Sequence, residues 1–539
     1  MQVGEAMVAQ MARWGIKDLF GLSGSSILPL LDALRRQGTI HYWTVRHEES
    51  AAFMASAYAK LTGRLGVCLA HAGPGAAHLI NGLYDAHKDR YPVLAITGQV
   101  ATDHIGTCYK QSSDESLMFA GCTGFSRQVA APGEAVELLA AAMRYAIAMH
   151  DVAHVGIPSD LLSQLLPDTS LYDPEPYSIA PPQVDPAAID KAAKIIDAAQ
   201  NPVILMGQGA LKDAKAVLAL AEHLDAPVIT SLPAKGSLPE SHPLVMGPLG
   251  EAGTDAAVGA VHNADVLLML GSTWWPTQFM PKEVRVVQVD LRPTAIGSAH
   301  PAAVGVVGLI HDVLPHLKDK LPPRPRHHRS QSRPSKMGFD GDAFPAHPQA
   351  ILALIRKHLP NGSVIAVDTG LVTLWYGRTF PAREETTLLS GRWRSMGFAL
   401  PAALAAKAAR SDVPVVALAG DGGFAMTGME FATAVQHNLP ITVVVFNNGT
   451  LGEEAVKQIT ADLPVYGMDL RNPDFAMFAK AAGGQGFHPR TTRELDEALE
   501  EAIRSYRPAL VDVPTLFVAP PALTESAQQL ARGAANFSR

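Results

Sequence analysis

The stretch VVALAGDGG at residues 415–423 and the stretch ITVVVFNNGT at residues 441–450 decide the fold. Each begins with a short apolar run of strand length, and each run ends in small or polar residues. Runs that are apolar on both faces are typical of parallel strands covered by helices on both sides. A helix is expected between the two stretches, at about residues 428–437, so that the whole forms one β–α–β unit.

Asp421 and Asn448 follow the two predicted strands of this unit. Because the carboxyl ends of parallel strands meet at one edge of a sheet, where open α/β folds bind ligands, we expect these side chains to lie together. The carboxylate of Asp421, the amide oxygen of Asn448 and the backbone carbonyl at Thr450 would give Mg²⁺ three oxygen ligands and leave positions for phosphate oxygens. Neighbouring glycines would let a diphosphate approach the backbone near a helix N-terminus. These glycines are Gly420, Gly422 and Gly423.

A Gly-Asp-Gly sequence alone is more often only a turn. Here it follows a predicted strand, and Asn-Asn follows it one β–α–β unit later. In this arrangement the sequence resembles the thiamine diphosphate enzymes of the pyruvate oxidase and acetolactate synthase group. The resemblance extends from Gly4 to about Pro520 and implies thiamine diphosphate and Mg²⁺ as cofactors.

The rest of the chain repeats this alternation of short apolar runs with Ala- and Leu-rich helical stretches, which predicts an α/β protein with parallel sheets. Pro-rich segments interrupt the pattern near residues 167–190 and 321–338. The second is also basic, and we interpret it as an extended linker, with a nucleic-acid arm or a histidine metal tract as the alternative. We predict three doubly wound domains, a linker and a tail. These are a pyrimidine-binding domain at 1–170, a central domain at 187–320, the linker at 321–344, a diphosphate- and Mg²⁺-binding domain at 345–520, and the tail at 521–539.

The composition limits the classes of function. The 539 residues include 44 Lys and Arg against 51 Asp and Glu, and the resulting net charge of −7 disfavours a protein that mainly coats nucleic acid or anionic lipid. The three cysteines cannot form a full disulfide framework, which favours a reducing cytoplasm. The N-terminus lacks a secretory signal pattern, and no apolar run approaches 18 residues. We therefore expect a cytoplasmic protein without a nucleic-acid partner.

The sequence RHEE at residues 46–49 follows an apolar run and opens a predicted helix at 50–61. It resembles the family's Arg-His-Glu motif, which implies that Glu48 is the catalytic acid that acts on the aminopyrimidine ring of the cofactor. The alternative for Glu48, and our interpretation of Glu49, is a carboxylate that only stabilises a helix N-terminus, by about 0.3–1 kcal/mol.

A second motif, AGPGAAHLING at residues 72–82, resembles the family's Gly-Pro-Gly loop and the helix after it. It implies cofactor contacts from Gly73 and Asn81 and an active-site role for His78, with a structural helix histidine as the alternative. The amino-acid sequence from His78 onward is most similar to that of pyruvate oxidases and pyruvate:quinone dehydrogenases. The resemblance also places Gln111 among the catalytic residues.

Two further stretches in the C-terminal part resemble the family. SMGFALPAA at residues 395–403 matches a stretch whose methionine lies under the thiazolium ring, a role that the resemblance implies for Met396. A long, unbranched apolar side chain suits such a wedge. Asp-Thr-Gly at residues 368–370 matches the loop that opens this domain and places Gly370 near the diphosphate.

The prediction of a bound flavin concerns the central part of the chain. Gly207, Gly209, Gly271 and Asp290 follow or end predicted strands and resemble the family's FAD-binding domain. The dinucleotide fingerprint is incomplete, because Lys212 stands where its third glycine would be. Related families keep this domain without a flavin, so the prediction of FAD depends on the resemblance.

The predicted substrate pocket departs from the pyruvate oxidase pattern at Lys110, Glu453 and Glu454. Relatives that reduce a flavin carry an aromatic residue where this chain has Glu453. A carboxylate there would disfavour an anionic 2-oxo acid unless it is paired, and Lys110 and Lys457 are candidate partners. Alternatively, both glutamates begin a helix and face solvent.

The resemblance implies an enzyme that decarboxylates a short 2-oxo acid, with pyruvate as the first candidate, and oxidises the enamine through FAD. The alternative, favoured by Glu453, is a non-oxidative carboligase or decarboxylase such as acetolactate synthase. A non-catalytic relative is a third hypothesis, against which Glu48, Asp421 and Asn448 argue. Because the family builds each site between two chains, we expect at least a homodimer and more specifically a homotetramer. The segment 523–539 is only weakly amphipathic, so membrane contact is not expected.

Overall fold

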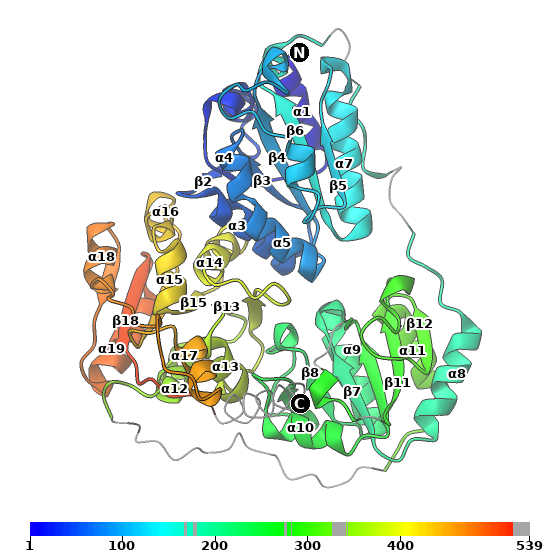
Figure 1. The fold of residues 1–539 in the computed structure, drawn as a ribbon. Helices are drawn as coiled ribbons and strands as arrows, with labels where there is room; N and C mark the ends of the chain where they lie inside the picture. The colour runs from blue at the N-terminus through cyan, green and yellow to red at the C-terminus, as the bar shows by residue number, and fades with distance from the viewer. Residues whose placement is uncertain are drawn as a thin grey trace.

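The structure is a computed structural model that describes residues 1–166, 170–175, 180–273, 277–281, 283–325, 341 and 343–520. The described residues form three six-stranded sheets, in which all neighbouring strands are parallel and helices cover the faces (Figure 1). This architecture confirms the predicted α/β fold class with three doubly wound sheets. Within the described ranges no helix is long and apolar enough to cross a membrane. All three cysteines are free.

The N-terminal sheet has the strand order β2-β1-β3-β4-β6-β5. Its strands are β1 (Asp18–Gly21), β2 (His41–Thr44), β3 (Gly66–Ala70), β4 (Val93–Gln99), β5 (Phe125–Gln128) and β6 (Val152–Pro158). The α-helices of this part are α1 (Val3–Arg13), α2 (Leu28–Gln37), α3 (Glu48–Thr62), α4 (Pro74–His78), α5 (Ile80–Asp89), α6 (Glu115–Met118) and α7 (Ala135–Met149). Every residue of β3, β4 and β6 is buried, as parallel strands covered on both faces must be.

The central sheet has the order β12-β11-β10-β7-β8-β9. Its strands are β7 (Pro202–Met206), β8 (Val228–Thr230), β9 (Val245–Pro248), β10 (Val266–Leu270), β11 (Arg285–Asp290) and β12 (Val304–Val307). Its α-helices are α8 (Pro186–Asp197), α9 (Ala214–Leu224), α10 (Asp255–His262) and α11 (Ile310–Lys320). Most of the predicted linker, residues 326–340 and 342, and the whole predicted tail lie outside the described residues.

The C-terminal sheet has the order β14-β13-β15-β16-β18-β17. Its strands are β13 (Val364–Val367), β14 (Thr386–Leu389), β15 (Val415–Gly420), β16 (Thr442–Asn447), β17 (Gln485–Phe487) and β18 (Ala509–Pro514). Its α-helices are α12 (Pro348–His358), α13 (Leu371–Thr379), α14 (Ala399–Ala409), α15 (Asp421–Thr427), α16 (Glu430–Gln436), α17 (Gly452–Thr460), α18 (Phe475–Ala481) and α19 (Thr492–Arg504).

The decisive β–α–β unit differs from its prediction in one respect. β15 and β16 pair in parallel as expected, but helix begins already at Asp421 and forms two short helices, α15 and α16, instead of one at 428–437. Gly420 is extended at the start of α15, and Asp421 brings a carboxylate to its first turn, where negative charge is favourable. The metal-binding prediction therefore falls on a helix start and not on a loop.

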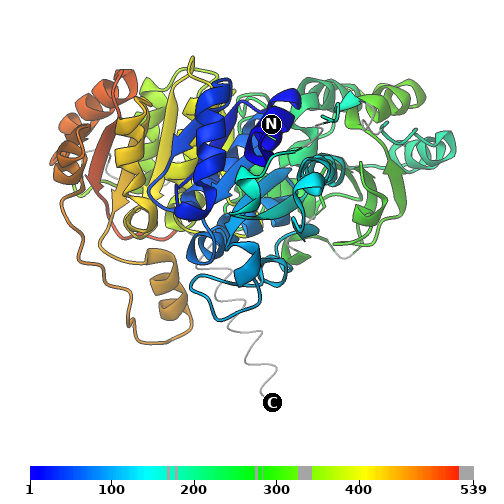
Figure 2. The same ribbon diagram turned by 90° about the horizontal axis from the view of Figure 1, so that it is seen from above.

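The N-terminal and C-terminal sheets share one hydrophobic core. α3 packs against α14, and the rings of Phe53 and Phe398 meet edge to face with centroids 5.6 Å apart. Both helices carry many buried alanines, which allows close approach. Figure 2 shows the two parts side by side, with the central part beyond them.

Candidate active site

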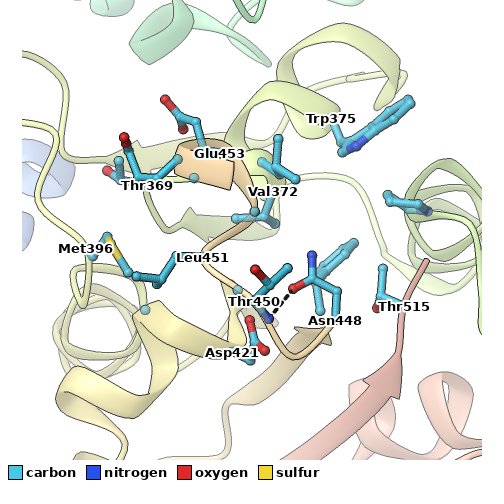
Figure 3. A pocket seen from close by; sticks show the side chains of 18 of the residues that line it. Thr369, Val372, Trp375, Met396, Asp421, Asn448, Thr450, Leu451, Glu453 and Thr515 are labelled. Carbon is cyan, nitrogen blue, oxygen red and sulfur yellow. Dashed lines mark hydrogen bonds between the residues drawn. The ribbon is translucent and has the colours of Figure 1, made fainter. Parts of the chain in front are cut away.

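A cavity of about 290 Å³ lies at the carboxyl edge of the C-terminal sheet (Figure 3). Loops that follow β13, β15 and β16 line it together with the start of α17, as is usual for open α/β sheets. Its lining residues all fall between 348 and 518, so no described residue of 1–170 is among them. Nine of the predicted site residues line it: Gly370, Met396, Gly420, Asp421, Gly423, Asn448, Thr450, Glu453 and Glu454.

Asp421 lies at the start of α15 and is 2% exposed. Its Oδ1 accepts a hydrogen bond from the backbone N–H of Gly422 at 3.0 Å, and its Oδ2 accepts one from Gly449 at 2.8 Å. Burial raises the pKa of this carboxyl above its ordinary value, although the hydrogen bonds oppose the shift. A cation beside it would favour the charged form and offset the cost of burial.

The two other predicted cation ligands lie next to Asp421 (Figure 3). Oδ1 of Asn448 accepts a hydrogen bond from the backbone N–H of Thr450 at 3.1 Å, which fixes the turn after β16. Oxygen ligands converging on one cavity edge suit Mg²⁺. Sequence reasoning missed Asn472, whose Nδ2 donates to Asp421 Oδ2 at 2.7 Å and to Asn447 Oδ1 at 2.9 Å. Asn472 lies 51 positions after Asp421, and no local motif marks it.

Close packing accounts for two of the three glycines around Asp421. A Cβ atom at Gly422 would lie 2.7 Å from Cδ2 of Leu451 and 3.3 Å from Cε of Met396. A Cβ atom at Gly423 would lie 2.9 Å from the carboxylate of Asp368. The glycines thus let Met396 and Asp368 pack directly against α15.

Gly420 and Gly370 have a different role. A Cβ atom at either position would meet nothing within 4 Å, so both lie beside open space at the cavity. Gly370 also has φ of +136°, which disfavours any side chain there. These two positions offer exposed backbone that a diphosphate can approach.

Asp368 follows β13 and is 1% exposed. Its Oδ1 accepts hydrogen bonds from the backbone N–H groups of Thr369 at 2.8 Å and Gly397 at 2.9 Å. Burial, opposed by such hydrogen bonds, raises the pKa of this carboxyl to about 7. Through Gly397 the carboxyl fixes the loop that carries Met396 beside the cavity.

Glu453 and Glu454 begin α17 but lie in different environments. The Glu454 side chain is 56% exposed and pairs with Lys457 at 2.8 Å. The Glu453 side chain is 12% exposed, and its Oε1 lies 3.1 Å from Nζ of Lys457 and 3.9 Å from Nη2 of Arg394. Its Oε2 is buried without a hydrogen-bond partner among the described residues. The solvent-facing alternative therefore holds for Glu454 and not for Glu453, whose lysine partner is Lys457 and not Lys110.

In the N-terminal part, Glu48 is the first residue of α3 and is 7% exposed. Its Oε2 lies 2.9 Å from Nδ1 of His78, and the ring of His47 stacks on that of His78 with centroids 4.3 Å apart. Sequence reasoning missed Glu430, which accepts the backbone N–H of His47 at 3.0 Å. Glu48 and His78 are thus in contact, and Glu430 fixes the start of their helix from the C-terminal part.

The remaining predicted residues of this part are divided between two places. Gly73 has φ of +66°, and a Cβ atom there would lie 2.8 Å from the carbonyl oxygen of Gln111. Gln111 and Lys110 are exposed in the same loop. Asn81 instead joins the two halves of the chain, because its Nδ2 donates to Oγ of Ser395 at 2.9 Å. The structure brings Gly73 and Gln111 together, and the ion-pair partners of Glu453 among the described residues do not include Lys110.

A larger cavity of about 900 Å³ is lined by residues of all three parts, including Arg90, Arg392 and Arg394. Burial, together with the nearby charges of Arg292 and Arg392, lowers the pKa of Arg90 to about 10. Clustered guanidinium groups favour an anionic ligand such as a diphosphate. Thr369 and Arg394 line both cavities, which are therefore adjacent.

Of the residues predicted to bind FAD, Gly271 lines this larger cavity. A Cβ atom at Gly207 would lie 2.4 Å from the carbonyl oxygen of Gly271, and one at Gly209 would lie 2.9 Å from its Cα atom. These two glycines therefore permit close packing of the loops after β7 and β10. Asp290 is 8% exposed and accepts the backbone N–H of Arg292 at 3.0 Å, and burial raises its pKa.

Comparison with known families finds three matching models. A thiamine pyrophosphate enzyme N-terminal TPP binding domain matches residues 1–118. The central domain of the same enzymes matches residues 189–317, and their C-terminal TPP binding domain matches residues 368–513. The three matches follow the order of the three sheets.

Curated relatives match over almost the whole chain. A Bacillus subtilis protein provisionally named as thiamine pyrophosphate-containing is 34% identical over 522 residues, which cover 95% of this chain and 91% of the relative. The acetolactate synthase isozyme 2 large subunit of Escherichia coli is 32% identical and covers 95% of both chains. The pyruvate oxidase of Lactiplantibacillus plantarum is 30% identical and covers 94% of this chain and 88% of the relative.

Proposed function

The chain belongs to the thiamine diphosphate enzymes of the pyruvate oxidase and acetolactate synthase family, and from this premise we propose that it decarboxylates pyruvate or another short 2-oxo acid. We further propose that the two-carbon product is oxidised through FAD. The observation that carries the proposal is the group of Asp421, Asn448 and Thr450 at the edge of a cavity that also contains Met396.

Different residues around this cavity would bind the metal ion and the diphosphate. Asp421, Asn448 and the backbone at Thr450 would hold Mg²⁺, while Gly420 and Gly370 leave room for a diphosphate. When bound, thiamine diphosphate supplies the carbon nucleophile and the electron sink for loss of CO₂.

Glu48 would hold a proton at its Oε atoms and exchange it with the aminopyrimidine ring, while His78 fixes the carboxylate through its contact of 2.9 Å. No described residue of 1–170 lines the cavity of the same chain, so Glu48 would serve the cofactor bound to a second copy. The functional unit is then at least a homodimer, and we propose a homotetramer as the full assembly.

The adjacent cavity supports the oxidative route. Its volume and its cluster of Arg90, Arg392 and Arg394 suit a dinucleotide with two phosphates. Because Arg394 and Thr369 line both cavities, a flavin there would lie next to the site of decarboxylation. This adjacency is what electron transfer from the two-carbon product requires.

A second candidate is a non-oxidative carboligase or decarboxylase of the acetolactate synthase type. The observation that favours it is Glu453, which lines the decarboxylation cavity at a position where flavin-reducing relatives carry an aromatic residue. A buried carboxylate paired with Lys457 and Arg394 cannot replace an aromatic ring as an electron relay.

The visible spectrum of the purified protein decides between the two routes. A bound flavin that bleaches when pyruvate is added without oxygen supports oxidation. A flavin that stays oxidised while CO₂ is released supports the carboligase or decarboxylase, and a colourless protein removes FAD.

Two variants test the site itself. Glu48→Gln should lower turnover by about 10²–10⁴-fold with excess thiamine diphosphate, and Asp421→Ala should lose binding of Mg²⁺ and thiamine diphosphate. A mixture of the two inactive chains should regain up to about a quarter of the activity, because a mixed dimer contains one complete site. Full turnover by Glu48→Gln alone would contradict its assigned role.

A further inference from the structure

Three side chains able to bind a metal converge beside, but outside, the cavity already described. Asp474 precedes α18, His488 follows β17, and Asp512 lies within β18. One ligand atom from each, a carboxylate oxygen or an imidazole nitrogen, lies within 4.8 Å of the other two. Nδ1 of His488 and Oδ2 of Asp512 are 3.1 Å apart.

Among the described residues, no lysine or arginine balances the charge of Asp512. It is 1% exposed, and its salt-bridge contact among the described residues is with His488, with no lysine or arginine in reach. Buried carboxylates in proteins are ordinarily paired with a cation or bound to a metal, because an isolated buried charge is costly. Asp474 adds a second carboxylate and no positive charge.

The orientation of Asp512 is fixed by a chain of amide side chains. Nδ2 of Asn447 donates to Asp512 Oδ1 at 2.9 Å, which leaves Oδ2 directed at His488. Oδ1 of Asn447 in turn accepts a hydrogen bond from Asn472 at 2.9 Å. Carboxylates that bind metals are typically held in this way by hydrogen bonds to the oxygen that faces away from the metal.

We propose that Asp474, His488 and Asp512 form a second divalent-cation site, distinct from the Mg²⁺ edge at Asp421. One imidazole and two carboxylates suit Zn²⁺ or Mn²⁺ better than Mg²⁺, which prefers oxygen ligands alone and retains its waters. Bonds of about 2.0–2.2 Å place neighbouring ligand atoms about 3–3.5 Å apart, a spacing that His488 Nδ1 and Asp512 Oδ2 already meet at 3.1 Å. An oxygen of Asp474 lies within 4.8 Å of both atoms; this exposed side chain is also the N-cap of α18, where its Oδ1 accepts the backbone N–H of Met477 at 2.8 Å.

The test measures metal binding and does not depend on the proposed enzymatic activity. Full-length protein is freed of metal, saturated with thiamine diphosphate and Mg²⁺, and titrated with ZnCl₂ by calorimetry, and with CoCl₂ by visible absorption. The unsubstituted protein should bind Zn²⁺ at this site with a dissociation constant below about 1 mM. Asp474→Asn and His488→Gln should each weaken that binding by at least about tenfold.

His242→Gln is the matched control, because His242 lies 3.2 Å from Glu222 in a pair to which the described residues add no third ligand. It should leave the titration unchanged. Asp474 and His488 are exposed, so their variants are expected to keep the fold, and melting curves without zinc check this directly. Zn²⁺ should raise the Tm of the unsubstituted protein and of the control by more than that of the two variants, in which His47, Glu48 and His78 remain as a second group of possible zinc ligands. Equal zinc binding by all four proteins, or none by the unsubstituted protein, would overturn the proposal.

Discussion

Replacing Asp368 by Asn removes a buried ionisable group from the base of the cavity at almost constant size. The carboxylate is 1% exposed and accepts backbone hydrogen bonds from Thr369 and Gly397. Burial, opposed by these hydrogen bonds, raises its pKa from 3.8 to about 7. At pH 5 to 6 the folded protein therefore holds a proton on Asp368 that the unfolded chain has released.

The sign and size of the effect on stability follow from this shift. Because the pKa is raised in the folded state, the contribution of Asp368 is fully present below about pH 4 and is lost as the pH rises to 7. At about 1.4 kcal/mol per pKa unit the whole loss is about 4 kcal/mol, of which about 3 kcal/mol falls between pH 5 and pH 8.5. The Asn variant lacks this loss, so its stability relative to the parent should rise by about 3 kcal/mol over that interval. A constant penalty from the new amide does not affect this difference.

The assay is thermal melting of parent and variant from pH 5 to pH 8.5, in EDTA and without cofactor. Because the N-terminal and C-terminal parts share one core, the cooperative unit has roughly 340 residues and its Tm changes by about 1–2 °C per kcal/mol, so the difference in Tm should change by about 3–6 °C. Asp103→Asn is the matched control, because its side chain is 75% exposed, and it should follow the parent at every pH. If the Asp368→Asn curve also runs parallel to the parent, the argument that burial keeps this carboxyl protonated is refuted.

Two other substitutions have defined outcomes. Gly423→Ala places a Cβ atom 2.9 Å from the Asp368 carboxylate, so we expect the free energy of unfolding to fall by about 1–3 kcal/mol and thiamine diphosphate to bind more weakly. Thermal melting and cofactor titration measure the two effects, and an unchanged protein would contradict the packing argument. Glu115→Gln should expose a hidden pH dependence. Burial raises the pKa of Glu115 to about 7 and lowers that of His154 to about 3, and between pH 4.5 and 6.5 these opposite effects on stability cancel. In this variant the stability contribution of His154 is fully present above pH 6.5 and is lost as the pH falls. The variant's Tm should therefore drop more steeply than the parent's from pH 7 to pH 5. Equal slopes would show that the contributions of Glu115 and His154 do not cancel in the parent.

The part of the site that the sequence predicted is the part carried by one β–α–β unit. Asp421 and Asn448 each follow a strand, and strand direction alone brings them to one sheet edge. Periodicity therefore sufficed to place them, although it missed the helix that begins at Asp421. The glycines after Asp421 have low helix propensity and favour a loop, whereas the packing of Asp368 against Gly423 favours the helix.

Other residues that shape the site could not be found from local patterns, because each acts over a long sequence separation. Asn472 contacts Asp421 from 51 positions away, and Glu430 holds the N–H of His47 from 383 positions away. Arg394 adopts φ of +55°, a conformation that a sequence would suggest only for glycine or asparagine. For Glu453 the sequence left both a buried and an exposed position open, because the same helix start permits either until its neighbours are known.

The position of Glu48 bears on the proposal that the active site forms between two chains. α3 packs on α14, and Glu430 binds the backbone just before α3, so the start of this helix is fixed to its own C-terminal part. That attachment leaves every described N-terminal residue out of the lining of the cavity that contains Asp421. A carboxylate held so firmly by its own chain cannot swing into its own cavity without breaking the shared core. In its proposed role Glu48 would therefore act on a cofactor bound to a second copy, and the attachment of α3 to its own C-terminal part supports the proposed dimer.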